Sequence, residues 1–190
     1  MSDFDEIFED AMGGSQPLGA AAEFIDACRL YLARSKFAED QSSIFFSRLS
    51  EVLLHRGWRE NAAACARVAF ELRPEQEDVA NLCAWVFSNC QRYEDAAAAY
   101  ERLLQIRPRW AEGHRHISGS LAAAGQLDRA ILHAGTASDL DTHSFEFALH
   151  AAALCEAAGR YQDATRAAAS PHAPAPLAAD VGPQICSGRA

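Results

Sequence analysis

The chain has 190 residues, is 49% hydrophobic and 23% charged, and carries a formal net charge of −9, a length that suits a single domain. The mean hydropathy is −0.15, and no apolar run approaches the ~20 residues of a transmembrane helix, so we expect no membrane insertion. The negative charge argues against nucleic acid as a partner, because nucleic acid rewards clustered positive charge. About 40 alanines favour a helical protein, because alanine is the strongest intrinsic helix former.

Residues 1–17 are predicted to form an acidic arm. Residues 1–10 contain five acidic and no basic side chains, which is more than half of the net charge, interleaved with Phe4, Ile7 and Phe8. Gly13, Gly14 and Pro17 then disfavour a helix. Two interpretations stay open: a solvated, disordered arm, or a short segment that folds onto a partner or onto this protein's own groove. A single helix is expected next, near residues 18–35, as part of an N-terminal cap over 18–41.

The middle of the chain repeats every 34 residues. Pro74 and Pro108 each end an apolar stretch, and a glycine recurs at the same interval, with Gln91 as an exception, at Gly57, Gly125 and Gly159. Four alanines keep the same phase: Ala62, Ala96, Ala130 and Ala164. Within each repeat, the apolar residues are spaced as in two helices that flank a short turn. Small residues in phase would let the two antiparallel helices of each repeat approach closely.

This set of small, glycine, aromatic, alanine and proline positions resembles the tetratricopeptide repeat family. The resemblance covers about two thirds of the chain and implies an all-α solenoid of three and a half to four helical hairpins after an N-terminal helix. We place the repeats within 43–170, at 43–76, 77–110, 111–144 and 145–170. The aromatic residue that the family carries early in each first helix is kept in one repeat alone, the four positions being Phe46, Ala80, His114 and Ala148.

The C-terminal end departs from the family's pattern. Pro171 ends the last predicted helix early, and four prolines predict a flexible tail over 171–190. Repeat arrays need polar caps at both ends, and no C-terminal cap is evident. We therefore expect the last helices to pack on another element, or the array to pair with a second copy.

The sequence holds no motif for catalysis, a metal or a cofactor. None of the phosphate-binding, dinucleotide-binding, zinc-protease or nucleophile-elbow motifs is present. His114 and His116 diverge by about 200° on a helix, so we do not expect them to share a metal. The six cysteines lack C-x-x-C spacing, which favours reduced, buried thiols and a cytoplasmic location. We expect a protein that is not an enzyme.

The expected binding surface is the concave wall made by the first helix of each repeat. Side chains there that avoid the apolar stripe are Arg48, Glu51, His55, Asn81, Trp85, Asn89, Arg115, His116, His150 and Glu156. Asn81, Trp85 and Asn89 form one line along a helix. Two interpretations of Trp85 stay open: an exposed anchor for a peptide, or a ring packed on the neighbouring repeat.

The leading hypothesis is a non-catalytic adaptor or scaffold that holds a peptide or helix of a partner protein in this groove. In the family's best-known ligand mode, lysines and asparagines of the groove hold a C-terminal carboxylate. The single lysine of this chain, Lys36, lies outside the repeats, so we do not expect that mode here. Residues 147–152 with Gly159 and Ala164 also resemble the last repeat of tetratricopeptide-type chaperones for type III secretion translocators, which implies an exported client as an alternative. A second alternative is a recruiting region of a larger enzyme such as a glycosyltransferase, suggested by the shortened fourth repeat.

Overall fold

The computed structural model describes residues 21–35 and 39–169, which form α-helices and no strands. Their bounds are α2 Ala21–Ser35, α3 Glu39–His55, α4 Arg59–Leu72, α5 Glu77–Asn89, α6 Tyr93–Ile106, α7 Ala111–Ala123, α8 Leu127–Leu140, α9 Phe145–Ala157 and α10 Tyr161–Ala168. The predicted arm over 1–17, the tail over 171–190 and Lys36 lie outside the described residues.

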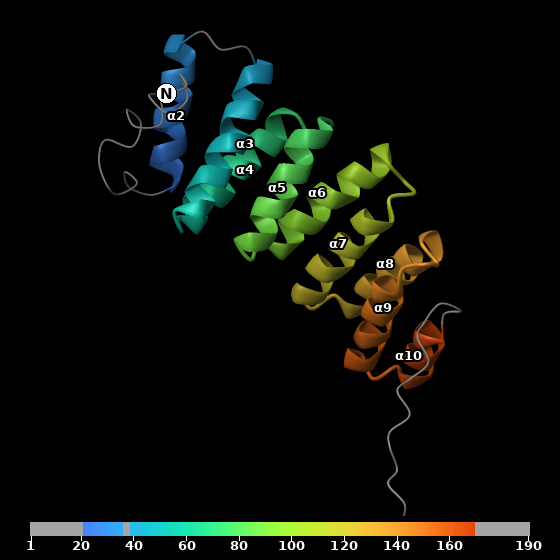
Figure 1. Cartoon of the computed structure of the whole chain (residues 1–190). Helices are drawn as coiled ribbons and strands as arrows, with labels where there is room; N and C mark the ends of the chain where they lie inside the picture. The colour runs from blue at the N-terminus through green and yellow to red at the C-terminus, as the bar shows by residue number, and fades with distance from the viewer. Residues whose placement is uncertain (1–20, 36–38, 170–190) are drawn as a thin grey trace, which may run out of the picture.

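The helices pair into consecutive hairpins that stack along the chain. Within the hairpins α3 packs on α4, α5 on α6, α7 on α8 and α9 on α10, and each second helix also contacts the first helix of the next hairpin. Figure 1 shows this stack running in chain order from α2, which packs against α4, to α10. The all-α, tetratricopeptide-type solenoid expected from the sequence is therefore confirmed. None of the described helices is long and apolar enough to cross a membrane.

The 34-residue period of the sequence is also the period of the helices. α5, α7 and α9 begin at 77, 111 and 145, while α4, α6, α8 and α10 begin at 59, 93, 127 and 161. α3 begins at Glu39, one turn earlier than this phase would place it. The four in-phase alanines are buried completely or nearly so in the core, with Ala62, Ala96 and Ala130 at 0% exposure and Ala164 at 3%.

One residue with a positive φ ends the first helix of every hairpin. The φ values are 83° at Gly57, 62° at Gln91, 80° at Gly125 and 72° at Gly159. The backbone N–H groups that follow return to the helix, as where Arg92 N–H donates to Phe87 C=O at 2.9 Å and Gln91 N–H donates to Ser88 C=O at 3.1 Å. These bonds satisfy carbonyls that the helix end would leave unpaired. Gln91 therefore keeps the backbone of the repeat although it lacks glycine's freedom.

Ion pairs link successive second helices on the outside of the stack. Arg67 pairs with Asp95 at 2.7 Å, and one repeat later the charges are reversed, with Glu101 pairing with Arg129 at 2.7 Å. The side chains are one third to one half exposed, so each pair contributes about 0–1 kcal/mol. One repeat after Glu101 the chain has Gly135, which has no side chain to form a further ion pair.

Substituting Gln91 by glycine should stabilise the protein. A non-glycine residue in the left-handed region costs ~1–2 kcal/mol, and glycine at this position removes that cost. Part of the gain in stability is lost again, because glycine also makes the unfolded chain more flexible. We expect Gln91→Gly to raise the free energy of unfolding by about 0.5–1 kcal/mol in urea titrations. The reciprocal change one repeat later, Gly125→Gln, should lower it by a similar amount. Equal stability of the two variants would contradict this account of the turn.

Enlarging an in-phase alanine should separate the two helices of its hairpin. Ala96→Leu forces three carbon atoms into a site with 0% exposure, and overpacking of this kind costs about 1–3 kcal/mol. The matched control is Ala98→Leu, in the same helix but exposed, which should change the free energy of unfolding by less than about 0.5 kcal/mol. Urea unfolding measures both. A loss of stability for Ala98→Leu as large as for Ala96→Leu would show that α6 resists leucine for another reason.

Candidate binding groove

A cavity of about 540 Å³ opens on the first helices of three consecutive hairpins. We call it the Trp85 groove, and its lining residues are Arg48, Asp78, Asn81, Leu82, Trp85, Tyr100 and His116. Arg48 comes from α3, four residues come from α5, Tyr100 comes from α6 and His116 comes from α7. Four of the side chains proposed from the sequence therefore line one cavity.

Aromatic rings form the apolar part of the Trp85 groove. Trp85 is 39% exposed, and its ring centroid lies 6.0 Å from that of His55 on α3. Tyr100 is buried and stacks on His116, with centroids 5.1 Å apart and an interplanar angle of 12°. Trp85 thus contacts the neighbouring hairpin and also lines the cavity. A bound side chain would find a large apolar surface here.

Some polar side chains at this surface form ion pairs or hydrogen bonds within the protein, and others do not. Arg48 pairs with Glu51 in its own helix at 3.2 Å. Asn89 Nδ2 donates to the Trp85 carbonyl at 2.8 Å, so one of the two N–H groups of this amide is used within α5. Asn81 is exposed and has no hydrogen-bond partner among the described residues. Of the two amides that flank Trp85, Asn81 is the one with no hydrogen bond to another described residue.

Arg115 lies one period after Asn81 and carries an uncompensated charge. It is half-buried, and no carboxylate among the described residues forms an ion pair with it. Burial lowers the pKa values of His116 and His150, and the nearby positive charge of Arg115 lowers both further. Both imidazoles are therefore neutral at pH 7, and Arg115 remains as the cation beside them.

His150 joins the third and fourth hairpins. Its Nε2 lies 3.0 Å from the hydroxyl oxygen of Ser118, which is fully buried on α7. This contact positions the imidazole of α9 against α7, one period after His116. Leu149 precedes His150 in the chain and is 53% exposed. The fourth hairpin therefore has an apolar side chain at the position where the third hairpin has Arg115.

Several proposed residues lie outside the cavity, and some residues that line it were not proposed. Those outside the lining are Glu51, His55, Asn89, Arg115, His150 and Glu156. The residues missed by the sequence analysis are Asp78, Leu82 and Tyr100. Asp78 and Leu82 precede Trp85 by seven and three residues, so helical spacing could have found them. Tyr100 is on a second helix, where its spacing resembles that of any core residue.

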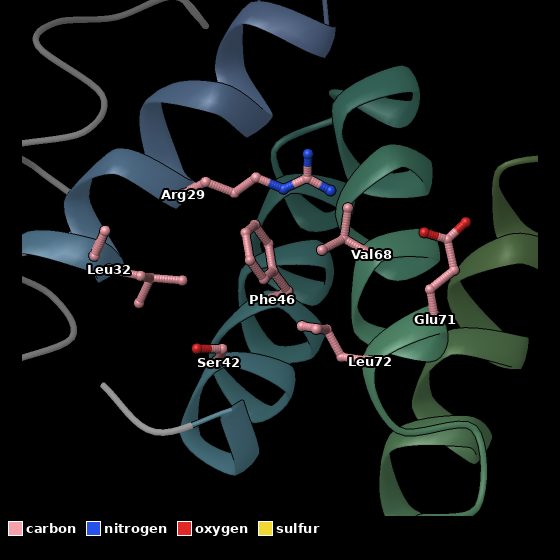
Figure 2. A pocket seen from close by; sticks show the side chains of 8 residues that line it. Arg29, Leu32, Ser42, Phe46, Val68, Glu71 and Leu72 are labelled. Atoms are coloured by element: carbon pink, nitrogen blue, oxygen red, sulfur yellow. The ribbon is translucent and has the colours of Figure 1, made fainter. Parts of the chain in front are cut away.

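A smaller cavity of about 330 Å³ lies at the N-terminal end of the described stack, between α2, α3 and α4. Figure 2 shows Arg29 extending from α2 toward α4, with Phe46 between these helices. Its walls are mainly apolar, with Arg29 and Glu71 as the charged members. None of the side chains proposed from the sequence lines this cavity.

The described cysteines are built for packing. Burial raises the pKa of Cys28 to about 11 and that of Cys83 to about 12, so both thiols are protonated at neutral pH. A thiolate nucleophile requires the opposite shift. Within residues 21–35 and 39–169, no group of three or more His, Cys, Asp or Glu side chains is placed to hold a metal ion.

Comparison with known proteins finds solved structures of similar fold. No family model matches the chain, and no curated protein sequence matches it. Solved structures of MamA resemble it along most of its length. A MamA RS-1 double mutant is 16% identical with a TM-score of 0.59, covering 90% of this chain and 93% of its own. MamA 41-end from Desulfovibrio magneticus RS-1 is 16% identical, with a TM-score of 0.58 and coverage of 88% and 92%.

A third MamA structure, from AMB-1, is 15% identical with a TM-score of 0.60 and covers 95% of this chain and 91% of its own. At such identities the similarity establishes the fold, which is a tetratricopeptide-like helical repeat. It leaves the chemistry of the groove to be argued from the residues of this chain.

The three half-buried histidines whose pKa values are lowered predict a loss of stability in mild acid. Folding lowers the pKa of His116, His133 and His150 below the ordinary 6.5, so the unfolded chain binds more protons in this range. The free energy of unfolding should therefore fall as the pH drops from 7.5 to 5.5. We expect His150→Gln to reduce this fall in urea titrations. A wild-type slope in His150→Gln would remove His150 from the explanation.

Proposed function

We propose that this protein is a non-catalytic interaction module that binds a segment of a partner protein along the Trp85 groove. The observation that carries the proposal is the exposed indole of Trp85 at a cavity of about 540 Å³, beside the amide of Asn81, which has no hydrogen-bond partner among the described residues. Cavities of this size can accept a side chain or a short peptide. Tryptophan is also one of the residue types that are enriched at binding hot spots.

Three chemical features describe the segment that would fit. An apolar or aromatic side chain would enter beside Trp85, Leu82 and Tyr100. The free amide of Asn81 can both donate to and accept from an extended backbone. The guanidinium of Arg115, one period further along, would pair with a carboxylate or a carbonyl oxygen of the same segment.

The adaptor, the secretion chaperone and the recruiting region of a larger enzyme are finer versions of this proposal. All three require a protein ligand in the groove, and they differ in whether that ligand is a scaffold component, an exported client or an enzyme's substrate. A general adaptor is favoured here, because the groove combines polar and apolar features that suit protein segments of several kinds. A cytoplasmic location and pairing with a second copy also stay predictions.

The groove predicts a specific loss of binding in matched variants. Wild-type protein and Trp85→Ala would be used to recover partners from native cells, followed by titration of each recovered protein. We expect Trp85→Ala to weaken the specific partner by about 30-fold or more, since a hot-spot tryptophan contributes ~2 kcal/mol or more. Arg115→Ala should weaken it by about 10-fold, because a charge-assisted bond is lost. Tyr161→Ala, which removes an exposed ring at the end of the stack, is the control and should bind normally.

Thermal unfolding would establish first that each variant is folded. A partner that binds folded Trp85→Ala and Arg115→Ala as tightly as it binds the wild type would exclude the Trp85 groove as its site. Failure to recover any protein that depends on Trp85 would contradict the proposed function itself.

A further inference from the structure

Two histidines face each other inside the third hairpin. His114 is on α7 and His133 is on α8, and their Nδ1 atoms lie 3.1 Å apart. The ring centroids are 5.2 Å apart with an interplanar angle of 33°. Both rings are half-buried. Neither histidine lines the Trp85 groove, so a role for the pair does not rest on the proposed function.

The third hairpin differs from the other three at both of these positions. One period earlier the same two positions are Ala80 and Ala99, and one period later they are Ala148 and Ala167. In the first hairpin they are Phe46 and Cys65, both buried. Two alanines therefore satisfy the packing at these positions in two of the four hairpins. Two imidazoles introduce four ring nitrogens where those hairpins carry none.

In one tautomer of His114, the Nδ1 lone pair points toward His133. Its Nε2 lies 3.4 Å from the Pro108 carbonyl, which can only accept, and the tautomer that is protonated at Nε2 has a lone pair on Nδ1. A metal-bound histidine commonly donates its other N–H to a backbone carbonyl in this way, which fixes the ring and its tautomer. With His114 in that tautomer, His133 would donate from Nδ1 to His114 Nδ1 across the 3.1 Å separation. When a metal ion binds to Nδ1 of His133, the proton of that nitrogen would move to Nε2 of the same ring.

The separation of the two nitrogens suits adjacent ligands of one ion. With metal–nitrogen bonds of about 2.0–2.1 Å, two nitrogens 3.1 Å apart subtend an angle of about 95–100° at the metal. This lies between the octahedral and tetrahedral angles. Imidazole nitrogen is a ligand of choice for zinc, copper and nickel ions.

We propose that His114 and His133 form a binding site for a divalent transition-metal ion that bridges α7 and α8. The two nitrogens supply two coordination positions, and water fills the others. The carboxylate of Glu101, whose charge acts on His133, is held by Arg129 at 2.7 Å and serves as a neighbouring charge. A bound ion would tie the two helices of the third hairpin together.

The site can be tested by titrating the full chain, without a histidine tag, with ZnCl₂ and with CuCl₂. We expect one saturable site per chain and, for Cu²⁺, an electron paramagnetic resonance spectrum with two nitrogen ligands. Zinc at one hundred times its Kd should raise the Tm by about 5 °C. Binding should weaken strongly at pH 5.5, because protonated imidazoles cannot coordinate.

Alanine is the appropriate substitution, because two other hairpins carry it at both positions. His114→Ala and His133→Ala should each weaken metal binding by about 10-fold or more, while the exposed His143→Ala should bind as the wild type does. Circular dichroism of the metal-free variants checks that they fold, and the double variant His114→Ala/His133→Ala reproduces the alanine pair of the second and fourth hairpins. Wild-type affinity in both single variants, or equal loss in His143→Ala, would overturn the proposal. So would the absence of saturable one-to-one binding.

Discussion

The structure depends on the close approach of the two helices in each hairpin. Ala62, Ala96 and Ala130 have no exposed surface, and each occupies the same position of a second helix. A larger side chain would increase the distance between helices and change how the next hairpin packs. Because the same constraint recurs every 34 residues, each hairpin presents its first helix in the same orientation. The geometry of the groove follows from this regularity.

Regular geometry allows the chemistry of the groove to vary along its length. Asn81, Arg115 and Leu149 occupy equivalent positions in the first helices of successive hairpins. The surface therefore passes from an amide to a cation to an exposed aliphatic side chain without any change of backbone. A partner that lies across the hairpins would meet these three chemistries in order, so the direction of the bound segment is specified as well as its composition.

Much of the fold could be predicted from the sequence, because local constraints determine it. Glycine in the turn, alanine in the second helix and the spacing of apolar residues each depend on neighbours within one hairpin, and Gln91 adopts the same positive φ as the glycines. The candidate site was predicted less completely. Tyr100 reaches the groove from a second helix, and the amide of Asn89 is bound to its own helix. Such facts depend on side-chain directions across helices, which spacing along one helix does not determine.

Departures from the repeat are the most informative residues of this chain. Trp85 has Glu51, Gly119 and Ala153 as its equivalents, so the fold does not require an indole at that position. His114 and His133 replace alanines that satisfy packing elsewhere, and desolvation, which lowers the pKa of His133, opposes its charged form. In a repeat protein, the other copies act as internal controls for what packing needs. A residue that exceeds this need, and exposes an aromatic ring or faces a second imidazole, is best explained by something that it binds.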